Sequence, residues 1–494
     1  MRRSRKEHAN LRRAASWSAP KSTDALNFGP KAAQNLQNSI QGSVVLPTDP
    51  DYAQARQDLL NTYQSYPQLV AYCEVARDVQ KCVAFAKKYG LYPVCRAGGH
   101  STAGFSVNDD MVIDVSRMGY VVIDAEEKRA TVGAGTDFAM FNAVLDTYRL
   151  HVPGGGCPSV NVAGYMQGGG YGFTSLLYGM NCDHVVEAVM VLANGKIVTV
   201  NERQHADLYW AVRGGTGNNF GVLVQITYRL HDLYRLWGFG LRWQLKSAAD
   251  LERGAEVLAT WQAHFTGEAA KPGLGHQMLI LYVQGEPWLM MRGMYDGSAA
   301  ECRGVLEPLF DLMADQKKQC DVWRGGTYEA LNGYLLAYPT DLPDVAMTTR
   351  TLVDSRFVAK QLEHADWAQV LAYFARSPAM GNFIAMEPMG GAINAIAPDA
   401  NAFCHRRAMI NVFTWVFWMT EGEKPEAERY AAEFDRVLTP LSNGHANQNY
   451  PNRNNKDYRW RYWGDNFDRL LQIKQRHDPN NLFRFPQMIS PGIT

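Results

Sequence analysis

The amino-acid sequence predicts an α+β protein built from two domains, and three observations support this. At 494 residues the chain is too long to fold around one hydrophobic core. Up to about residue 235, short helical segments alternate with pairs of strand-like runs. From about residue 236, longer strand-like runs alternate with amphipathic helices, which is typical of one sheet covered by helices on one face.

The first domain is expected to begin with a helix over residues 75–90, because its apolar residues share one face and Gly90 can end it. Four short strands follow, at residues 92–96, 111–115, 120–124 and 129–132. A helix at 137–148 comes next, and the last two strands are expected at 185–192 and 197–200. Asn194-Gly195 between these two strands is a strong hairpin signal.

The second domain is expected to contain four strands, at residues 237–245, 277–284, 289–295 and 408–419. Its amphipathic helices are predicted at 248–265 and 421–438. The tail is rich in Asn, Arg and Trp and has a helix at 466–476, which Asp478-Pro479 ends. The first 40 or so residues are expected to be a loosely ordered extension.

Composition excludes several classes of function. Lysine plus arginine and aspartate plus glutamate both total 49, so the balanced charge favours a small-molecule partner over nucleic acid or a membrane. The eight cysteines form no CxxC pair, which argues against a zinc site or a disulfide framework. The basic start lacks the apolar run of a secretory signal, so we expect a cytoplasmic protein. We expect it to be either a monomer or a homodimer.

Three glycine clusters stand in the first domain, at residues 96–101, 154–172 and 213–222. A single cluster could be a tight turn, but three together indicate that the backbone approaches a ligand closely. Neither a Walker loop nor a complete Rossmann fingerprint is present. Two clusters contain a nucleophilic side chain, His100 and Cys157. Taken singly, these could be a hydrogen-bonded turn histidine and a buried thiol.

These motifs resemble the berberine-bridge-enzyme-like group of FAD-linked oxidases, which are flavoproteins of the vanillyl-alcohol-oxidase or PCMH type. The similarity extends from about residue 45 to residue 490. The segments on which it rests include Arg96-Ala-Gly-Gly-His100-Ser, Val112-Ile-Asp-Val-Ser116, Gly156-Cys157-Pro-Ser-Val160, Gly168-Gly-Gly-Tyr-Gly172, Asp207-Leu-Tyr-Trp-Ala-Val-Arg-Gly214 and Tyr450-Pro-Asn452.

The resemblance implies four segments: an N-terminal extension (1–44), a PCMH-type FAD-binding domain (45–235), a substrate domain (236–444) and a berberine-bridge-like segment that returns to the FAD domain (445–494). It implies FAD bonded to His100 at its 8α-methyl group and to Cys157 at C6. Imidazole and thiolate are nucleophiles that can form such bonds. No metal is implied. The further implied cofactor-binding residues are Arg96, Gly98, Gly99, Ser101, Gly156, Val160, Gly164, Gly169, Gly170, Gly172, Gly221, Val222 and Asn452.

The implied reaction is hydride transfer from an alcohol, a hemiacetal such as a sugar, or an activated C–H or C–N bond to the flavin. Dioxygen then reoxidises the flavin and gives hydrogen peroxide. Val160 occupies the position where valine accompanies oxygen reactivity in relatives, whereas Asn161 replaces their usual glycine. The alternatives are a dehydrogenase with another electron acceptor, an oxidative tailoring enzyme of secondary metabolism, and a flavin-binding protein without turnover.

The proposed catalytic residues are Tyr450 and Arg453. Relatives often have Tyr-x-Asn-Tyr in the tail, and here Arg453 replaces the second tyrosine. Arginine stays protonated, so it could lower the pKa of Tyr450 or bind a substrate carboxylate or enolate, but it could not act as a base. The other polar candidates are Glu387, as a domain-interface acceptor or a site residue, and His405-Arg406, for which structural hydrogen bonds are the favoured role.

Overall fold

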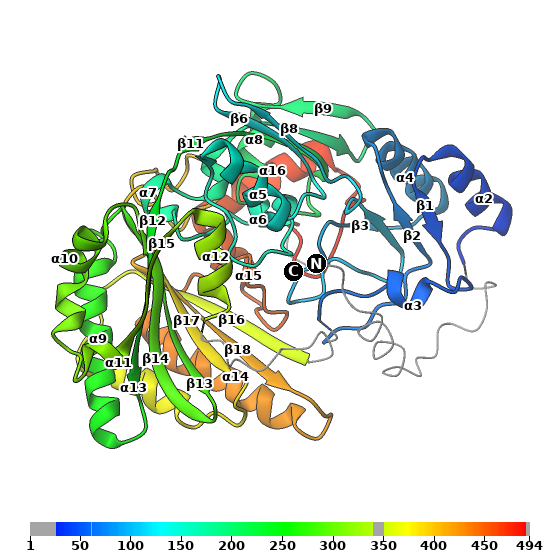
Figure 1. Ribbon diagram of the computed structural model, residues 1–494. Helices are drawn as coiled ribbons and strands as arrows, with labels where there is room; N and C mark the ends of the chain where they lie inside the picture. Colours follow the sequence, from blue (N-terminus) through cyan, green and yellow to red (C-terminus); the bar gives the residue numbers. More distant parts are fainter. Residues whose placement is uncertain (1–25, 61, 339–349, 491–494) are drawn as a thin grey trace.

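The computed structural model describes residues 26–60, 62–338 and 350–490. These residues form an α+β fold, as predicted, and are arranged in two domains (Figure 1). The first domain contains two sheets. One has the strand order β1-β2-β4-β3, and its last three strands are parallel. These four strands are β1 (Ser43–Val45), β2 (Leu69–Tyr72), β4 (Met111–Asp114) and β3 (Pro93–Arg96).

The second sheet of this domain is antiparallel and has the order β5-β6-β10-β8-β9. Its strands are β5 (Val121–Asp124), β6 (Arg129–Gly133), β10 (Gly221–Arg229), β8 (Val185–Leu192) and β9 (Ile197–Val200). A separate strand pair joins β7 (Leu150–His151) to β11 (His231–Asp232). The helices of this domain are α2 (Pro30–Ser39), α3 (Tyr52–Ala55), α4 (Ala76–Tyr89), α5 (Phe138–Tyr148), α6 (Val162–Gln167), α7 (Ser175–Tyr178), η2 (Asn181–His184) and α8 (Ala206–Val212).

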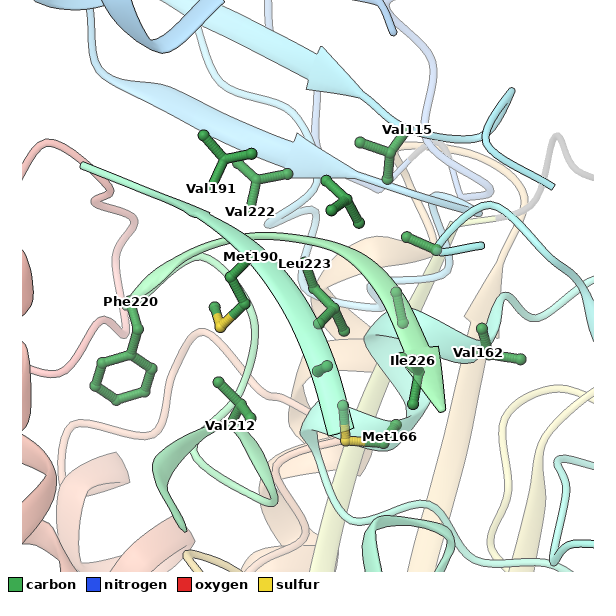
Figure 2. Close-up of a cluster of buried hydrophobic side chains, with 14 of the residues drawn as sticks. Val115, Val162, Met166, Met190, Val191, Val212, Phe220, Val222, Leu223 and Ile226 are labelled. Carbon is green, nitrogen blue, oxygen red and sulfur yellow. The ribbon is translucent and has the colours of Figure 1, made fainter. Parts of the chain in front are cut away.

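A common apolar core joins the elements of the first domain. Figure 2 shows Met190 of β8 beside Leu223 of β10, and Ile226 of β10 near Met166 of α6. Val222 of β10 is directly opposite Val191 of β8 in the register of the two strands. The glycine-rich segments that flank α6 and precede β10 are therefore attached to a rigid scaffold.

The second domain is a seven-stranded antiparallel sheet with the order β15-β12-β14-β13-β17-β18-β16. Its strands are β15 (Cys320–Gly326), β12 (Leu236–Gln244), β14 (Glu286–Tyr295), β13 (Leu274–Val283), β17 (Phe383–Pro388), β18 (Ile410–Trp418) and β16 (Arg350–Val358). Four long helices pack on the outer face: α9 (Ala248–Phe265), α10 (Ala299–Phe310), α13 (His364–Phe374) and α14 (Lys424–Leu438). The short elements of this domain are α11 (Gln316–Gln319) and η3 (Thr439–Leu441).

One helix departs from the prediction that helices cover a single face of this sheet. Helix α12 (Tyr328–Leu336) packs on the inner face, where Leu331 and Leu335 join a cluster with Leu279 and Met290. This cluster is separate from the one under the outer helices. The inner face is therefore partly covered by α12, and the rest of it faces the first domain.

The tail returns to the first domain. Helices α15 (Tyr458–Trp463) and α16 (Phe467–His477), joined by η4 (Gly464–Asn466), contribute Leu470 and Ile473 to the first domain's core. The buried Lys474 ammonium donates to the carbonyl oxygen of Asn219 at 2.6 Å and pairs with Asp478 at 2.6 Å. The tail thus fixes the segment just before β10.

The expectation of a loosely ordered N-terminal extension is wrong for the part that the structure describes. Residues 30–39 form α2, and Phe28, Leu36 and Ile40 are buried in the first domain's core. The helix was missed because only a few apolar residues form its buried face. Residues 1–25 lie outside the described part of the chain.

None of the helices in the described residues has both the length and the apolar character that crossing a bilayer requires.

Candidate active site

A cavity of about 570 Å³ lies where the first domain, the inner face of the second domain's sheet and the tail meet. This volume is in the usual range for sites that bind small molecules or cofactors. The first domain lines it with backbone from the predicted glycine clusters, including residues 97–102, 155–157 and 216–218. The sheet contributes polar and aromatic side chains, and the tail contributes residues 447–451.

His100 and Cys157 are distant in sequence, but both lie at this cavity on either side of Ser159. The Ser159 hydroxyl oxygen is 3.0 Å from His100 Nε2 and 3.5 Å from Cys157 Sγ. Burial lowers the pKa of His100, so the imidazole is neutral and nucleophilic at pH 7. Cys157 is exposed, whereas the other seven cysteines are buried or half-buried. The two nucleophiles therefore face the same space.

Two of the glycines around this pair are required by close contacts within the protein, and a third opens on the cavity. A Cβ on Gly98 would lie 2.3 Å from Asn161 Oδ1, and one on Gly172 would lie 2.0 Å from the carbonyl oxygen of Gly154. Glycine is needed at both positions because the neighbouring segment of the protein leaves no room for a side chain. A Cβ on Gly164, in contrast, would meet nothing within 4 Å, because that position faces open cavity. With an imidazole and a thiol as its reactive groups, the site fits FAD.

Most of the predicted cofactor residues line the cavity, and five do not. Those that line it are Gly98, Gly99, His100, Ser101, Gly156, Cys157, Val160, Gly164, Gly172 and Gly221. Arg96 lies behind the wall, where it forms a buried ion pair with Asp114 at 2.5 Å. Asn452 forms a turn by accepting from the Asn454 amide. Gly169, Gly170 and Val222 also lie outside the lining, and Val222 belongs to the core.

Val160 and Asn161 both line the cavity, at the start of α6. The Asn161 amide donates to the carbonyl oxygen of Gly135 at 2.6 Å, so its side chain is fixed against Gly98. The unusual asparagine thus connects the two loops that carry His100 and Cys157.

Glu387 of β17 and Tyr450 of the tail form a buried pair in the cavity wall. The Tyr450 hydroxyl donates to Glu387 Oε1 at 2.9 Å, and the Asn411 amide donates to Oε2 at 2.8 Å. Burial raises the pKa of Glu387 to about 7, and burial together with Glu387 raises the pKa of Tyr450 well above its usual value. Glu387 can therefore exchange a proton near neutral pH. It lies in the site itself, not merely between the domains.

Arg453 is placed differently from its predicted role beside Tyr450. Its guanidinium donates to the carbonyl oxygens of Ala103 and Gly104 and lies 3.9 Å from the centre of the Tyr63 ring. It is outside the cavity lining, and the pKa of Tyr450 is raised, not lowered. Arg453 holds the tail against the loop that follows His100.

His405 and Arg406 make the structural hydrogen bonds that the sequence favoured. Arg406 donates to both carboxylate oxygens of Asp183, at 2.6 and 2.8 Å, across the boundary between the domains. His405 Nε2 lies 3.1 Å from the side-chain oxygen of Gln448, a residue of the cavity wall.

Sequence reasoning missed two polar residues on the inner face of the sheet, Gln277 of β13 and Arg292 of β14. The available signal was a lone arginine inside the apolar run Leu289-Met-Met-Arg-Gly-Met-Tyr295. A charge within such a strand must be paired or functional.

Two family models match this chain. One describes an FAD binding domain and covers residues 67–201, and the other is "Berberine and berberine like" and covers residues 448–490. The first includes both His100 and Cys157, and the second includes Tyr450.

Similar proteins match over nearly the whole chain. YgaK, an uncharacterized FAD-linked oxidoreductase of Bacillus subtilis, is 27% identical over 92% of this chain and 98% of its own length. Xylooligosaccharide oxidase of Thermothelomyces thermophilus is 25% identical over 86% of this chain and 88% of its own. The solved structure of BBE-like 1 from Physcomitrella patens aligns with a TM-score of 0.82 at 25% identity, over 93% of this chain and 98% of its own.

Proposed function

Since this chain is an FAD-dependent oxidoreductase of the berberine-bridge-enzyme-like group, we propose that its FAD is bonded to both His100 and Cys157. The proposed reaction is the oxidation of a small molecule at an alcohol, a hemiacetal, or an activated C–H or C–N bond. Dioxygen is the final electron acceptor, and the products are the oxidised substrate and hydrogen peroxide.

One observation supports this proposal most directly. His100 and Cys157 meet around the Ser159 hydroxyl at one cavity, with the imidazole neutral and the thiol exposed. FAD, when bound there, would supply the acceptor for the hydride of the substrate, which is one proton with two electrons. The protein's part is to hold the substrate, exclude water and move the remaining proton.

Glu387 and Tyr450 are suited to move that proton. Tyr450 can take it from a substrate hydroxyl while passing its own phenolic proton to Glu387 Oε1, the atom to which it already donates. Burial keeps the pKa of Glu387 at about 7, so a substantial fraction is ionised at neutral pH and can accept the proton. Stacking on Phe413, with ring centres 4.2 Å apart, holds the Tyr450 ring in place.

The linkage is tested by denaturing the purified protein and measuring the flavin that stays attached. Wild-type protein is expected to retain it, and so are His100→Ala and Cys157→Ala, because one bond remains in each. The double variant is expected to release it. Cys320→Ala, at a half-buried cysteine outside the cavity lining, is the matched control. Free flavin from denatured wild-type protein would contradict the proposal.

The electron acceptor is a separate question. Val160 favours dioxygen, whereas Asn161, fixed between the two flavin-bearing loops, leaves a dehydrogenase as the second candidate. The ratio of peroxide released to substrate oxidised distinguishes them: an oxidase gives a ratio near one, and a dehydrogenase turns over with an artificial dye but releases little peroxide.

A further inference from the structure

The inner face of the second domain's sheet carries a buried cation. Arg292 is only 9% exposed and forms part of the cavity wall. Burial alone accounts for its pKa, which falls to about 10, and no carboxylate among the described residues raises it. A buried arginine without an acidic partner is unfavourable unless other groups compensate the charge.

The contacts of Arg292 leave one donor unused. Nη1 donates to the carbonyl oxygens of Leu335 and Tyr338 at 3.0 and 3.1 Å, at the C-terminal end of α12. Nε and Nη2 each donate to the side-chain oxygen of Gln277, at 3.2 and 2.8 Å. A guanidinium has five N–H groups, so one N–H of Nη2 has no acceptor among the described residues.

The charges of the cavity wall are few. Among the described residues that line it, Arg292 is the only lysine or arginine, and Glu387 is the only carboxylic acid. Glu387 is engaged with Tyr450 and Asn411. An anionic group on a ligand would therefore find one fixed positive charge, and Arg292 would gain the acidic partner that the described residues do not supply.

The rest of this wall is apolar. The side chains that the sheet presents beside Arg292 and Glu387 include Leu279, Leu281, Phe383, Phe413 and Trp415. Phe383 and Trp415 are stacked, with ring centres 5.9 Å apart and planes inclined by 13°. Such a surface suits an apolar or aromatic body better than a free sugar, whose many hydroxyl groups need polar partners.

We infer that the substrate is an apolar or aromatic molecule bearing one carboxylate, and that Arg292, oriented by Gln277, binds this carboxylate. The inference rests on the proposed function, because it concerns the same cavity. In this arrangement the carboxylate is held by Arg292 on β14, while the oxidised carbon and its hydroxyl lie toward Tyr450 and Glu387.

The test uses the flavin-loaded protein and two pairs of probes that differ in charge: benzoate with benzamide, and cinnamate with cinnamamide. Binding is followed by the change in the visible absorption spectrum of the flavin. Each carboxylate is expected to bind roughly ten- to a hundred-fold more tightly than its amide, as for a charge-assisted hydrogen bond. Arg292→Met is expected to abolish this preference, because it weakens carboxylate binding far more than amide binding.

Arg242→Met is the matched control, because Arg242 is on the neighbouring strand β12, pairs with Asp321 at 3.2 Å and lies outside the cavity lining. It is expected to keep the full preference. Arg292→Lys retains the charge but lacks the planar guanidinium, so it is expected to keep a reduced preference for carboxylates. This variant preserves the test if Arg292→Met does not fold.

Two results would overturn the inference: wild-type protein that binds neither carboxylate better than its amide, or a preference that survives in Arg292→Met. Either result would mean that Arg292 only fastens the end of α12. The proposed function would remain intact if, in either case, the protein retained its flavin on denaturation and another substrate reduced that flavin. Release of the flavin on denaturation would instead contradict that proposal alone.

Discussion

At the scale of single residues, Glu387 departs clearly from its ordinary behaviour. A glutamate in water titrates near pH 4.3, but burial raises the pKa of Glu387 to about 7. Its hydrogen bonds from Asn411 and Tyr450 favour the ionised form, but burial has the larger effect. The carboxyl group is therefore suited to act as a base in the pH range of an ordinary cell.

Glu387→Gln is expected to slow anaerobic reduction of the flavin by roughly 10²–10⁴-fold, the usual contribution of a general base. In wild-type protein the reduction rate is expected to fall as the pH drops below about 7, because Glu387 becomes protonated. This pH dependence should vanish in the variant. Stopped-flow measurements between pH 5.5 and 8.5 check both expectations.

Glu286→Gln is the control, since Glu286 is a surface partner of Lys246 and lies outside the cavity lining. If Glu387→Gln reduced the flavin at the wild-type rate, the proton would have to leave by another route.

The sequence pointed to His100 and Cys157 as candidate site residues because each directly follows a run of glycines, and both line the cavity. It could not assign Glu387 a catalytic role, because only tertiary packing determines its burial and its contact with Tyr450. Arg453 shows the opposite case, since its place in a tail motif predicted a catalytic role that its contacts with Ala103 and Gly104 do not support.

At the scale of elements, the loop after β3 and the N-terminus of α6 depend on one close contact. Asn161 is fixed by its hydrogen bond to the carbonyl oxygen of Gly135, and its side chain touches the Cα region of Gly98. Because neither loop has spare room here, the relative position of His100 and Cys157 depends on the absence of a side chain at residue 98.

Gly98→Ala is expected to lower the free energy of unfolding by about 1–3 kcal/mol, the usual cost of overpacking, because its Cβ would lie 2.3 Å from Asn161 Oδ1. Gly304→Ala, in the interior of α10 with nothing within 4 Å of the new Cβ, is the matched control. It is expected to raise stability by about 0.5–1 kcal/mol. Urea unfolding measures both, and equal stability of Gly98→Ala and wild type would contradict the packing argument.

Elements with regular apolar patterns were predicted well: α9 and β8 have the predicted bounds. Strand β16 was missed because its run Arg350-Thr-Leu-Val-Asp-Ser-Arg-Phe-Val358 is interrupted by charges. In the fold Arg356 is buried and pairs with Asp354 at 2.7 Å, so the strand is stable despite its low hydrophobicity. That partner is evident only from the structure.

At the scale of the whole molecule, two buried histidines, His151 and His184, and the half-buried His231 lie near the contact between the domains. His184 Nδ1 is 3.1 Å from His231 Nε2, and the ring centre of His151 is 4.2 Å from that of Tyr328 in α12. Burial, followed by repulsion from neighbouring charges, lowers the pKa of His151 and of His184 to about 3 and that of His231 to about 4. In the fold these histidines are therefore neutral at pH 7.

Unfolded histidine titrates near pH 6.5, so between that pH and about 4 the unfolded chain binds protons that folded His231 does not. The free energy of unfolding is therefore unaffected by His231 above pH 6.5, and His231 lowers it progressively as the pH falls from 6.5 to about 4. The melting temperature of His231→Gln is therefore expected to rise relative to that of wild type between pH 7.5 and pH 5.

The variant must be compared with wild type because Glu387 also titrates in this pH range. Its pKa is raised in the fold, so Glu387 makes the folded state more stable as the pH falls, whereas His231 makes it less stable. His264→Gln, at an exposed histidine, is the control variant. A constant difference in melting temperature between His231→Gln and wild type across the series would show that His231 titrates normally in the fold.

The return of the tail to the first domain has a consequence for the order of synthesis. Tyr450 and the anchor Lys474 are translated after the whole second domain, yet Tyr450 lines the cavity and Lys474 fixes the segment before β10. During translation the growing chain can form the first domain's sheets, but the cavity lacks one wall until the tail segment that contains Tyr450 has left the ribosome. A chain cut short before residue 450 is therefore expected to hold FAD less firmly than a chain that includes the tail.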